Sequence, residues 1–185
     1  MNAVIEAIRS RRSIRAYQDR KLAKKELEAI VEAGTWAPTG HNEQPWHFSV
    51  VQDRGLIAKV NGRAKAAMAR YDTEWIRTLG DDPDTDITRG APVLVIVSSR
   101  SQTVSGPIGC AAAMQNMMGA AQSMGIGSCW MGFAGFAFKD EALMAALGVP
   151  AGYRPQQAAV FGFPSGSAVQ TPARRSGVST YIGQF

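Results

Sequence analysis

A run of apolar and β-branched residues, PVLVIVSS at positions 92–99, restricts the possible folds more than any other segment. A run without the polar–apolar alternation of a half-exposed strand is typical of a strand covered on both faces. Residues 108–124 are apolar almost all round, with four methionines among alanines, which predicts a buried central helix. Together the two segments predict a sheet enclosed between layers of helices.

The rest of the chain alternates between helical and extended patterns. Apolar spacing predicts helices over 2–10, 24–34, 56–68 and 140–147, and strands over 47–51, 128–131 and 157–163. An acid-rich stretch at 80–86 predicts a surface loop, and the last 20 or so residues predict an irregular arm. This order predicts a three-layer α/β or α+β architecture. No linker or repeat divides residues 1–185, so we expect one domain.

Composition excludes several classes of protein. With 45% of its 185 residues apolar and 19% charged, the chain is too apolar for intrinsic disorder. It has no run of about 18 apolar residues, so we expect no transmembrane helix and no membrane partner. Charges interrupt the N-terminal region where a signal peptide needs an apolar core. Cys110 and Cys129 lack CxxC spacing and predict reduced thiols, so we expect a cytoplasmic protein.

The net charge of +5 is concentrated at the two ends of the chain. Residues 1–25 carry eight Lys or Arg against two acids, and residues 151–185 carry three Arg and no acid, whereas residues 26–150 have a net charge of −4. Nucleic-acid-binding proteins usually show a longer basic face with aromatic residues, so we expect no nucleic-acid partner. A solvated helix face with a basic tail explains the pattern, and so does a site for a phosphate group.

The N-terminal basic cluster has the sequence RRSIR. Arg11, Arg12 and Arg15 keep their charge at every physiological pH, and each guanidinium offers a planar fork of donors that suits phosphate oxygens. Ser13 adds a hydroxyl, and in an extended segment residues 11, 13 and 15 project to one side. The cluster is a candidate phosphate site, although a polar helix end, where cations are favoured near the last carbonyls, also explains it.

A second polar segment, APTGHNEQPWHF, spans residues 37–48. Its two prolines, its glycine and its short polar side chains predict a rigid loop able to hold the edge of a planar heterocycle. His41 and His47 are the only histidines and lack a third ligand, so we expect no metal site. Nothing in the sequence predicts a nucleophilic triad.

Taken together, these segments resemble the FMN-dependent nitroreductase family, in particular its small single-domain NAD(P)H nitroreductase branch. The resemblance covers nearly the whole chain and rests on RRSIRAY at 11–17, the 37–48 loop, GCAAAMQNMMGAAQSMGIGSCW at 109–130 and GFP at 162–164. It implies an α+β fold, a three-layer α/β/α sandwich with a central mixed sheet flanked by helices. It also implies a homodimer with FMN at the interface and a C-terminal arm that extends to the partner subunit.

The resemblance assigns cofactor-binding roles residue by residue. The FMN phosphate and ribityl chain contact Arg11, Arg12, Ser13 and Arg15, and either Arg174 or Arg175 returns to the phosphate. The isoalloxazine ring contacts a loop of the other subunit at Pro38, Thr39, Gly40 and Asn42, and the segment of Trp130, Met131 and Gly132. No side chain is catalytic in this scheme, because N5 of the flavin carries the hydride and only backbone near Met131 contacts it.

The implied activity is that of an NAD(P)H oxidoreductase. Hydride from NADH or NADPH reduces FMN, which then reduces a nitroaromatic, a quinone or a similar small aromatic acceptor by ping-pong exchange. Trp130, Phe133 and Phe136 are candidates to stack on nicotinamide or the acceptor, although Phe136 also suits an ordinary core position. Reductive dehalogenation, ene reduction and flavin breakdown are alternatives, and so is a protein without activity that binds nucleic acid or another anion.

Overall fold

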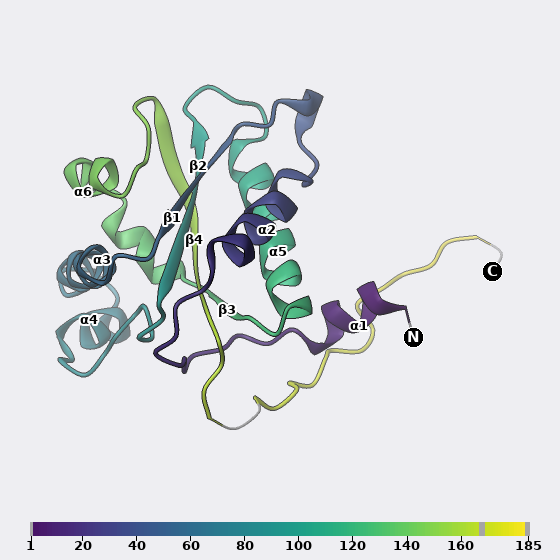
Figure 1. The fold of residues 1–185 in the computed structure, drawn as a ribbon, viewed down its shortest axis with the longest axis horizontal. Helices are drawn as coiled ribbons and strands as arrows, with labels where there is room; N and C mark the ends of the chain where they lie inside the picture. The colour runs from purple at the N-terminus through teal and green to yellow at the C-terminus, as the bar shows by residue number, and fades with distance from the viewer. Residues whose placement is uncertain (1, 167–168, 184–185) are drawn as a thin grey trace.

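The computed structural model describes residues 2–166 and 169–183, which form three layers (Figure 1). The middle layer is a sheet of β1 (Trp46–Val51), β2 (Val93–Arg100), β3 (Gly127–Trp130) and β4 (Tyr153–Gly162). One face carries α2 (Lys24–Thr35) and α5 (Gly106–Ser123), and the other carries α3 (Arg54–Met68), α4 (Glu74–Asp81), the 3-10 helix η2 (Gly132–Ala137) and α6 (Glu141–Ala146). A 3-10 turn η1 (Gly40–Asn42) precedes β1, and α1 (Ala3–Ser10) lies beside the C-terminal end of α5. The expected α/β/α sandwich is confirmed.

Strand β2 shows why the sheet needs helices on both faces. Leu94 and Ile96 point into the core on the side of α3, whereas Val93, Val95 and Val97 point into the core on the side of α5. All of β2 except its last residue is buried. Burial of each large apolar side chain contributes roughly 1.5–3 kcal/mol, so neither face of this strand can be left to solvent without a large loss of stability.

The strand order is β1-β2-β4-β3, and every pair of neighbouring strands is antiparallel. The expectation of a mixed sheet is therefore wrong. Along the chain, α5 connects β2 to β3, and these two strands run in the same direction. In the sheet, however, β4 lies between them and pairs antiparallel with both. Outside the named strands, an isolated bridge between Ser13 and Ser128 is parallel.

The acid-rich stretch at 80–86 is only partly a loop. Helix α4, which the sequence analysis did not predict, extends to Asp81, and Gly80 is buried within it. A Cβ at Gly80 would lie 2.4 Å from the backbone nitrogen of Ala69, so this glycine lets α4 pack closely on the end of α3. The signal was present in the sequence, because Ile76, Leu79 and Gly80 have helical spacing.

Both ends of the chain lie largely outside the core. None of the residues of α1 is buried, and its apolar side chains Val4, Ile5 and Ile8 are 66%, 49% and 63% exposed. The tail from 169 to 183 contains no helix or strand, as expected of an irregular arm, and Gln184 and Phe185 lie outside the described residues. Among the helices described here, none is both long and apolar enough to cross a membrane.

Candidate functional site

The basic segment runs in extended form along the edge strand β3. The N–H of Ile14 donates to the carbonyl of Ser128 at 2.9 Å, and Ser13 forms its bridge with the same residue. Gly127 permits this approach, because a Cβ there would lie 2.7 Å from Cγ1 of Ile14. The Tyr17 hydroxyl donates to the Ile14 carbonyl at 2.7 Å. The segment is therefore an ordered edge of the sheet, and not the solvated helix face that could explain its charge.

Arg12 is largely occupied by the protein itself. Its guanidinium donates to the carbonyls of Arg9 and Arg11, both at 2.7 Å, and also to the hydroxyl of Thr171 in the C-terminal tail. These contacts tie the end of α1 to the basic segment and to the tail. Arg12 therefore adds positive charge to this region but has fewer donors available for a ligand.

Arg11, Ser13 and Arg15 all influence the thiol of Cys129, whereas of these three only Ser13 and Arg15 line a pocket described below. Burial raises the pKa of the Cys129 thiol, and the charges of Arg15, Arg89 and Arg11, together with a hydrogen bond from Ser13, partly offset this. The thiol thus stays protonated at neutral pH, which agrees with its expected role as a small buried side chain. The charges of three arginines therefore reach this part of the molecule.

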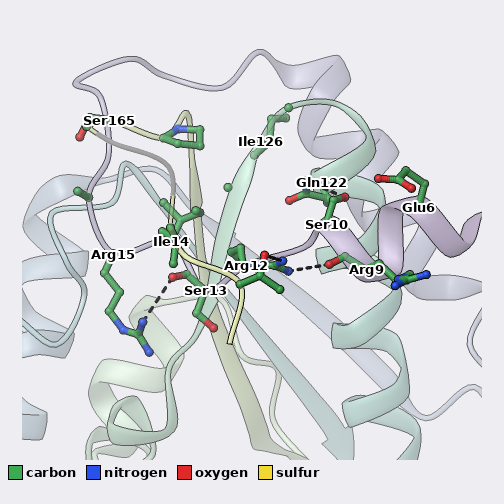
Figure 2. Close-up of a pocket in the computed structure, with 17 residues that line it drawn as sticks. Glu6, Arg9, Ser10, Arg12, Ser13, Ile14, Arg15, Gln122, Ile126 and Ser165 are labelled. Carbon is green, nitrogen blue, oxygen red and sulfur yellow. Dashed lines mark hydrogen bonds between the residues drawn. The ribbon is translucent and has the colours of Figure 1, made fainter. Parts of the chain in front are cut away.

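A cleft of about 960 Å³ opens beside the basic segment (Figure 2). Its walls are α1, the basic segment, the turn from α5 into β3 and the chain after β4. We call it the arginine cleft, and it is lined by Glu6, Arg9, Ser10, Arg12, Ser13, Ile14, Arg15, Ala16, Gln122, Gly125, Ile126, Gly127, Pro164, Ser165, Gly166, Val169 and Thr171. Three arginines against one glutamate make the lining basic, which suits an anionic ligand.

A smaller pocket of about 350 Å³ meets the arginine cleft at Arg15, which lines both. We call it the aromatic pocket, and it is lined by Arg15, Ile87, Arg89, Cys129, Trp130, Met131, Gly132, Phe133 and Phe136. The rings of Phe133 and Phe136 have centroids 6.4 Å apart. The structure therefore brings the predicted residues Trp130, Met131 and Gly132 next to the predicted basic cluster.

Arg89 is a residue of this pocket that the sequence analysis missed. It has no motif of its own, and only the flanking Asp86 and Gly90 in DITRG indicate a turn there. The backbone φ of Arg89 is 59°, in the left-handed region that a side chain with a Cβ seldom adopts. Local hydrogen bonds to Asp86 form this turn, but its position beside Arg15 depends on packing between segments distant in sequence, which local sequence does not report.

The polar loop before β1 is held by residues 103–105, which precede the N-terminal end of α5. The N–H of Gly40 donates to Oγ of Ser105 at 3.1 Å, and the Glu43 carboxylate accepts from the Thr103 hydroxyl at 2.5 Å and from the Val104 N–H at 3.1 Å. These hydrogen bonds, that of Thr103 foremost, lower the pKa of Glu43 to about 2. Glu43 was not predicted as a site residue, yet it anchors this loop.

The loop needs such an anchor because its backbone is strained. His41, Asn42 and Gln44 have φ values of 53°, 53° and 45°. Each residue in a sparsely populated conformation costs about 1–3 kcal/mol and persists only where the surroundings impose it. Strain of this kind is concentrated at functional sites, so the loop is a second candidate region.

The two candidate regions do not meet within one chain. The arginine cleft contacts α5 near its C-terminal end at Gln122, whereas the loop is pinned to residues 103–105, just before α5 begins. With a rise of about 1.5 Å per residue, the 18 residues of α5 separate them by roughly 25 Å. One end therefore holds Arg11, Arg12, Ser13 and Arg15, and the other holds Pro38, Thr39, Gly40 and Asn42.

The late basic residues are not part of the cleft in this chain. Arg174 and Arg175 are exposed, and neither lines the arginine cleft. The tail borders the cleft at Val169 and Thr171, then passes α1 and runs away from the body of the molecule (Figure 1). A return of either arginine to a phosphate stays a prediction.

Comparison with known proteins decides the family. The sequence model of the nitroreductase family matches residues 8–163, a span that includes the basic segment, the polar loop and the aromatic pocket. The chain belongs to the nitroreductase family. This membership agrees with the α+β architecture and with the resemblance that the sequence showed.

Solved and curated members of the nitroreductase family cover the chain closely. A nitroreductase with bound FMN from Bacteroides fragilis is 33% identical, with a TM-score of 0.93 over 99% of this chain and 100% of that one. A nitroreductase with bound FMN from Desulfitobacterium hafniense is 25% identical, with a TM-score of 0.89 over the same shares. A protein of Archaeoglobus fulgidus named "Putative NADH dehydrogenase/NAD(P)H nitroreductase" is 32% identical over 155 residues, which are 81% of this chain and 79% of the relative.

Proposed function

We propose that this protein is an FMN-dependent oxidoreductase that takes hydride from NADH or NADPH and reduces nitroaromatic, quinone or similar small aromatic acceptors by ping-pong exchange. The observation that carries the proposal is the junction of a basic cleft and an aromatic pocket at Arg15. FMN has the same two parts, a phosphate-bearing chain and a planar ring. The FMN bound by the Bacteroides fragilis and Desulfitobacterium hafniense nitroreductases supports this assignment.

The donors of the arginine cleft fit a phosphate group. Ser13 offers a hydroxyl, and the exposed guanidinium of Arg15 contacts the Ser13 carbonyl at the long distance of 3.4 Å, so its donors are available (Figure 2). Hydrogen bonds between a guanidinium and a phosphate are roughly twice as strong as neutral ones. Arg15 and Ser13 would hold the phosphate-bearing chain, while the occupied Arg12 adds charge and rigidity.

The backbone of the aromatic pocket determines which donor faces the ring. The N–H of Met131 already donates to the Ala158 carbonyl at 2.8 Å. Gly132 begins η2, and the first N–H of a helix has no acceptor within that helix. A Cβ on Gly132 would meet no atom within 4 Å, which leaves room for a ring to approach. We therefore assign the contact with N5 to Gly132 instead of Met131; bound FMN would accept hydride there and pass two electrons onward.

A continuous aromatic surface beside the pocket suits an aromatic acceptor. Trp75 of α4 packs on Phe133 with centroids 5.9 Å apart, and Tyr71 packs on Phe136 at 5.1 Å. Trp75 and Tyr71 are 58% and 45% exposed, so their faces are available to a ligand. Stacking on such rings contributes about 0.5–1.5 kcal/mol per pair beyond area burial.

A homodimer would complete the site. The loop and the arginine cleft lie at opposite ends of α5, so a loop can reach a cleft only from a second copy. Exposed apolar side chains border both regions, at Ile5 and Ile8 of α1, at Trp36 beside the loop and at Ile108 of α5, where Trp36 and Ile108 are 79% and 77% exposed. Apolar groups this exposed near a proposed site are typical of an interface. The extended tail would then lie on the partner.

The first test is an absorbance spectrum of the purified protein followed by anaerobic titration with NADH and NADPH. We expect a flavin spectrum that bleaches under either nucleotide. Arg15→Gln should weaken FMN binding by roughly 10- to 150-fold, because a hydrogen bond to a charged group contributes about 1.5–3 kcal/mol. Arg70→Gln, outside both pockets, is the matched control. A protein that purifies colourless and does not bind added FMN contradicts the proposal.

The dimer is tested by mixing variants. Arg15→Gln and Asn42→Ala each damage one half of the proposed site, and a heterodimer of the two, purified through different tags, contains one intact site only if the loop acts across subunits. We expect one tight FMN per heterodimer. Two weakened sites would show that both residues act in the same chain, and a mass near 19.8 kDa by light scattering would remove the dimer altogether.

A further inference from the structure

Two arginines, Arg15 and Arg89, are among the residues that line the aromatic pocket. Both also lie close enough to Cys129, another residue of the pocket lining, to influence the pKa of its thiol. Within residues 2–166 and 169–183, no ion pair involves either residue. No carboxylate is among the described residues that line this pocket, so a bound anion there would relieve the repulsion between the two like charges. The pocket that holds them is also lined by Phe133 and Phe136, so the favoured anion is a planar ring.

Hydrogen bonds hold the backbone of the turn that carries Arg89 in a defined conformation. The Asp86 carboxylate accepts three hydrogen bonds. Two come from Thr88, whose N–H donates at 2.7 Å and whose hydroxyl donates at 2.6 Å, and the third comes from the N–H of Gly90 at 2.7 Å. The side chain of Asn61 on α3 accepts from the N–H of Ile87 at 3.0 Å and joins this turn to the core. Burial acts to raise the pKa of Asp86, but these hydrogen bonds outweigh burial and lower it, so the anchor is ionised at neutral pH.

The left-handed backbone of Arg89 has a cost that glycine would avoid. A residue with a Cβ in this conformation loses roughly 1–2 kcal/mol relative to glycine, and the next residue, Gly90, has the same sign of φ at 63°. A turn of DITGG sequence would therefore be more stable on backbone grounds. A long cationic side chain at a position where glycine would be more stable favours a role for the side chain itself.

We propose that Arg89 is a second cation, beside Arg15, for the negatively charged edge of a planar ring in the aromatic pocket, and that this ring is the flavin in its reduced form. The inference rests on the proposed function. Addition of hydride, two electrons and one proton, from NAD(P)H leaves a negative charge on the reduced ring and releases NAD(P)⁺. A cation at this edge of the ring favours that charged form over the neutral oxidised form. Arg89 thus binds the cofactor and sets its reduction potential.

The experiment compares wild type, Arg89→Gln, Arg89→Lys and Arg89→Gly, with Arg70→Gln as control. The affinity for oxidised FMN is measured by flavin fluorescence, and the potential of bound FMN by anaerobic equilibration with a reference dye. We expect Arg89→Gln to weaken reduced FMN about tenfold more than oxidised FMN, which is a potential lower by about 30 mV for a two-electron couple. Arg89→Lys should recover most of the difference because it restores the charge.

Arg89→Gly separates charge from backbone strain. It should melt at a higher temperature than wild type and yet show the same lowered potential as Arg89→Gln. A potential unchanged in both variants overturns the proposal, as does a loss of folding stability in Arg89→Gly. The variants could instead leave the potential unchanged and raise KM for carboxylate-bearing nitroaromatics but not for neutral ones. In that case Arg89 binds the acceptor, and its assignment to the flavin is wrong. Failure of wild type to bind FMN would refute the proposed function separately.

Discussion

Replacement of Gly127 by alanine tests whether the arginine cleft depends on the close contact between the basic segment and β3. The added Cβ would lie 2.7 Å from Cγ1 of Ile14, and 3.0 Å from both Cβ of Ile14 and Cγ of Pro164. Overpacking of this kind costs about 1–3 kcal/mol, because Cβ of Ile14 cannot move without its backbone. Alanine is favoured over glycine in a strand by about 0.5–1 kcal/mol. The mid-points of these two ranges differ by about 1.25 kcal/mol, so the net expected loss is roughly 0.5–2 kcal/mol.

This loss has two measurable consequences. The melting temperature should fall by about 1–8 °C, given 2–4 °C per kcal/mol for a chain of this size. Because Ile14 lies between Ser13 and Arg15, its displacement should also weaken FMN binding, by up to about 30-fold if the whole cost appears in binding. Gly62→Ala is the control, since Gly62 is exposed on α3 with no atom within 4 Å of a Cβ, and it should stabilise slightly. Unchanged melting and FMN affinity in Gly127→Ala would refute the reasoning.

Three further predictions concern Glu43, Met117 and Cys110. Hydrogen bonds lower the pKa of Glu43 to about 2 from its ordinary 4.5. The stability that the carboxylate contributes is therefore complete above pH 4.5 and is lost as the pH falls toward 2. The free energy of unfolding of Glu43→Gln, measured in urea, should lack this pH dependence. Met117→Ala should lower the free energy of unfolding by about 2–5 kcal/mol in urea, because the fully buried side chain leaves a cavity. Burial raises the pKa of Cys110 to about 12, so a disulfide reagent should label it only after unfolding, and rapid labelling of native protein would contradict the structure.

Local chemistry was enough to find most of the fold and the first half of the site. The β-branched run of β2 and the all-round apolar α5 predict a sheet buried on both faces, because each side chain there has to leave water. RRSIR needs no partner to be recognised, because permanent charge and a planar fork of donors are properties of arginine itself. The mixed sheet was implied by the family resemblance and is wrong for this chain, because β4 lies between β2 and β3 and pairs antiparallel with both.

The sequence by itself determined which side chains carry charge and which are apolar, and hence that the chain is layered and has a candidate site for an anion. Only the tertiary structure decided which of them share a site. It placed Arg89 beside Arg15 through a turn held by Asp86, and it gave Glu43 its role by setting a loop against the start of α5. It also put the two predicted halves of the site at opposite ends of one helix. These placements arise from packing between segments distant in sequence, whose geometry is not encoded in any local pattern.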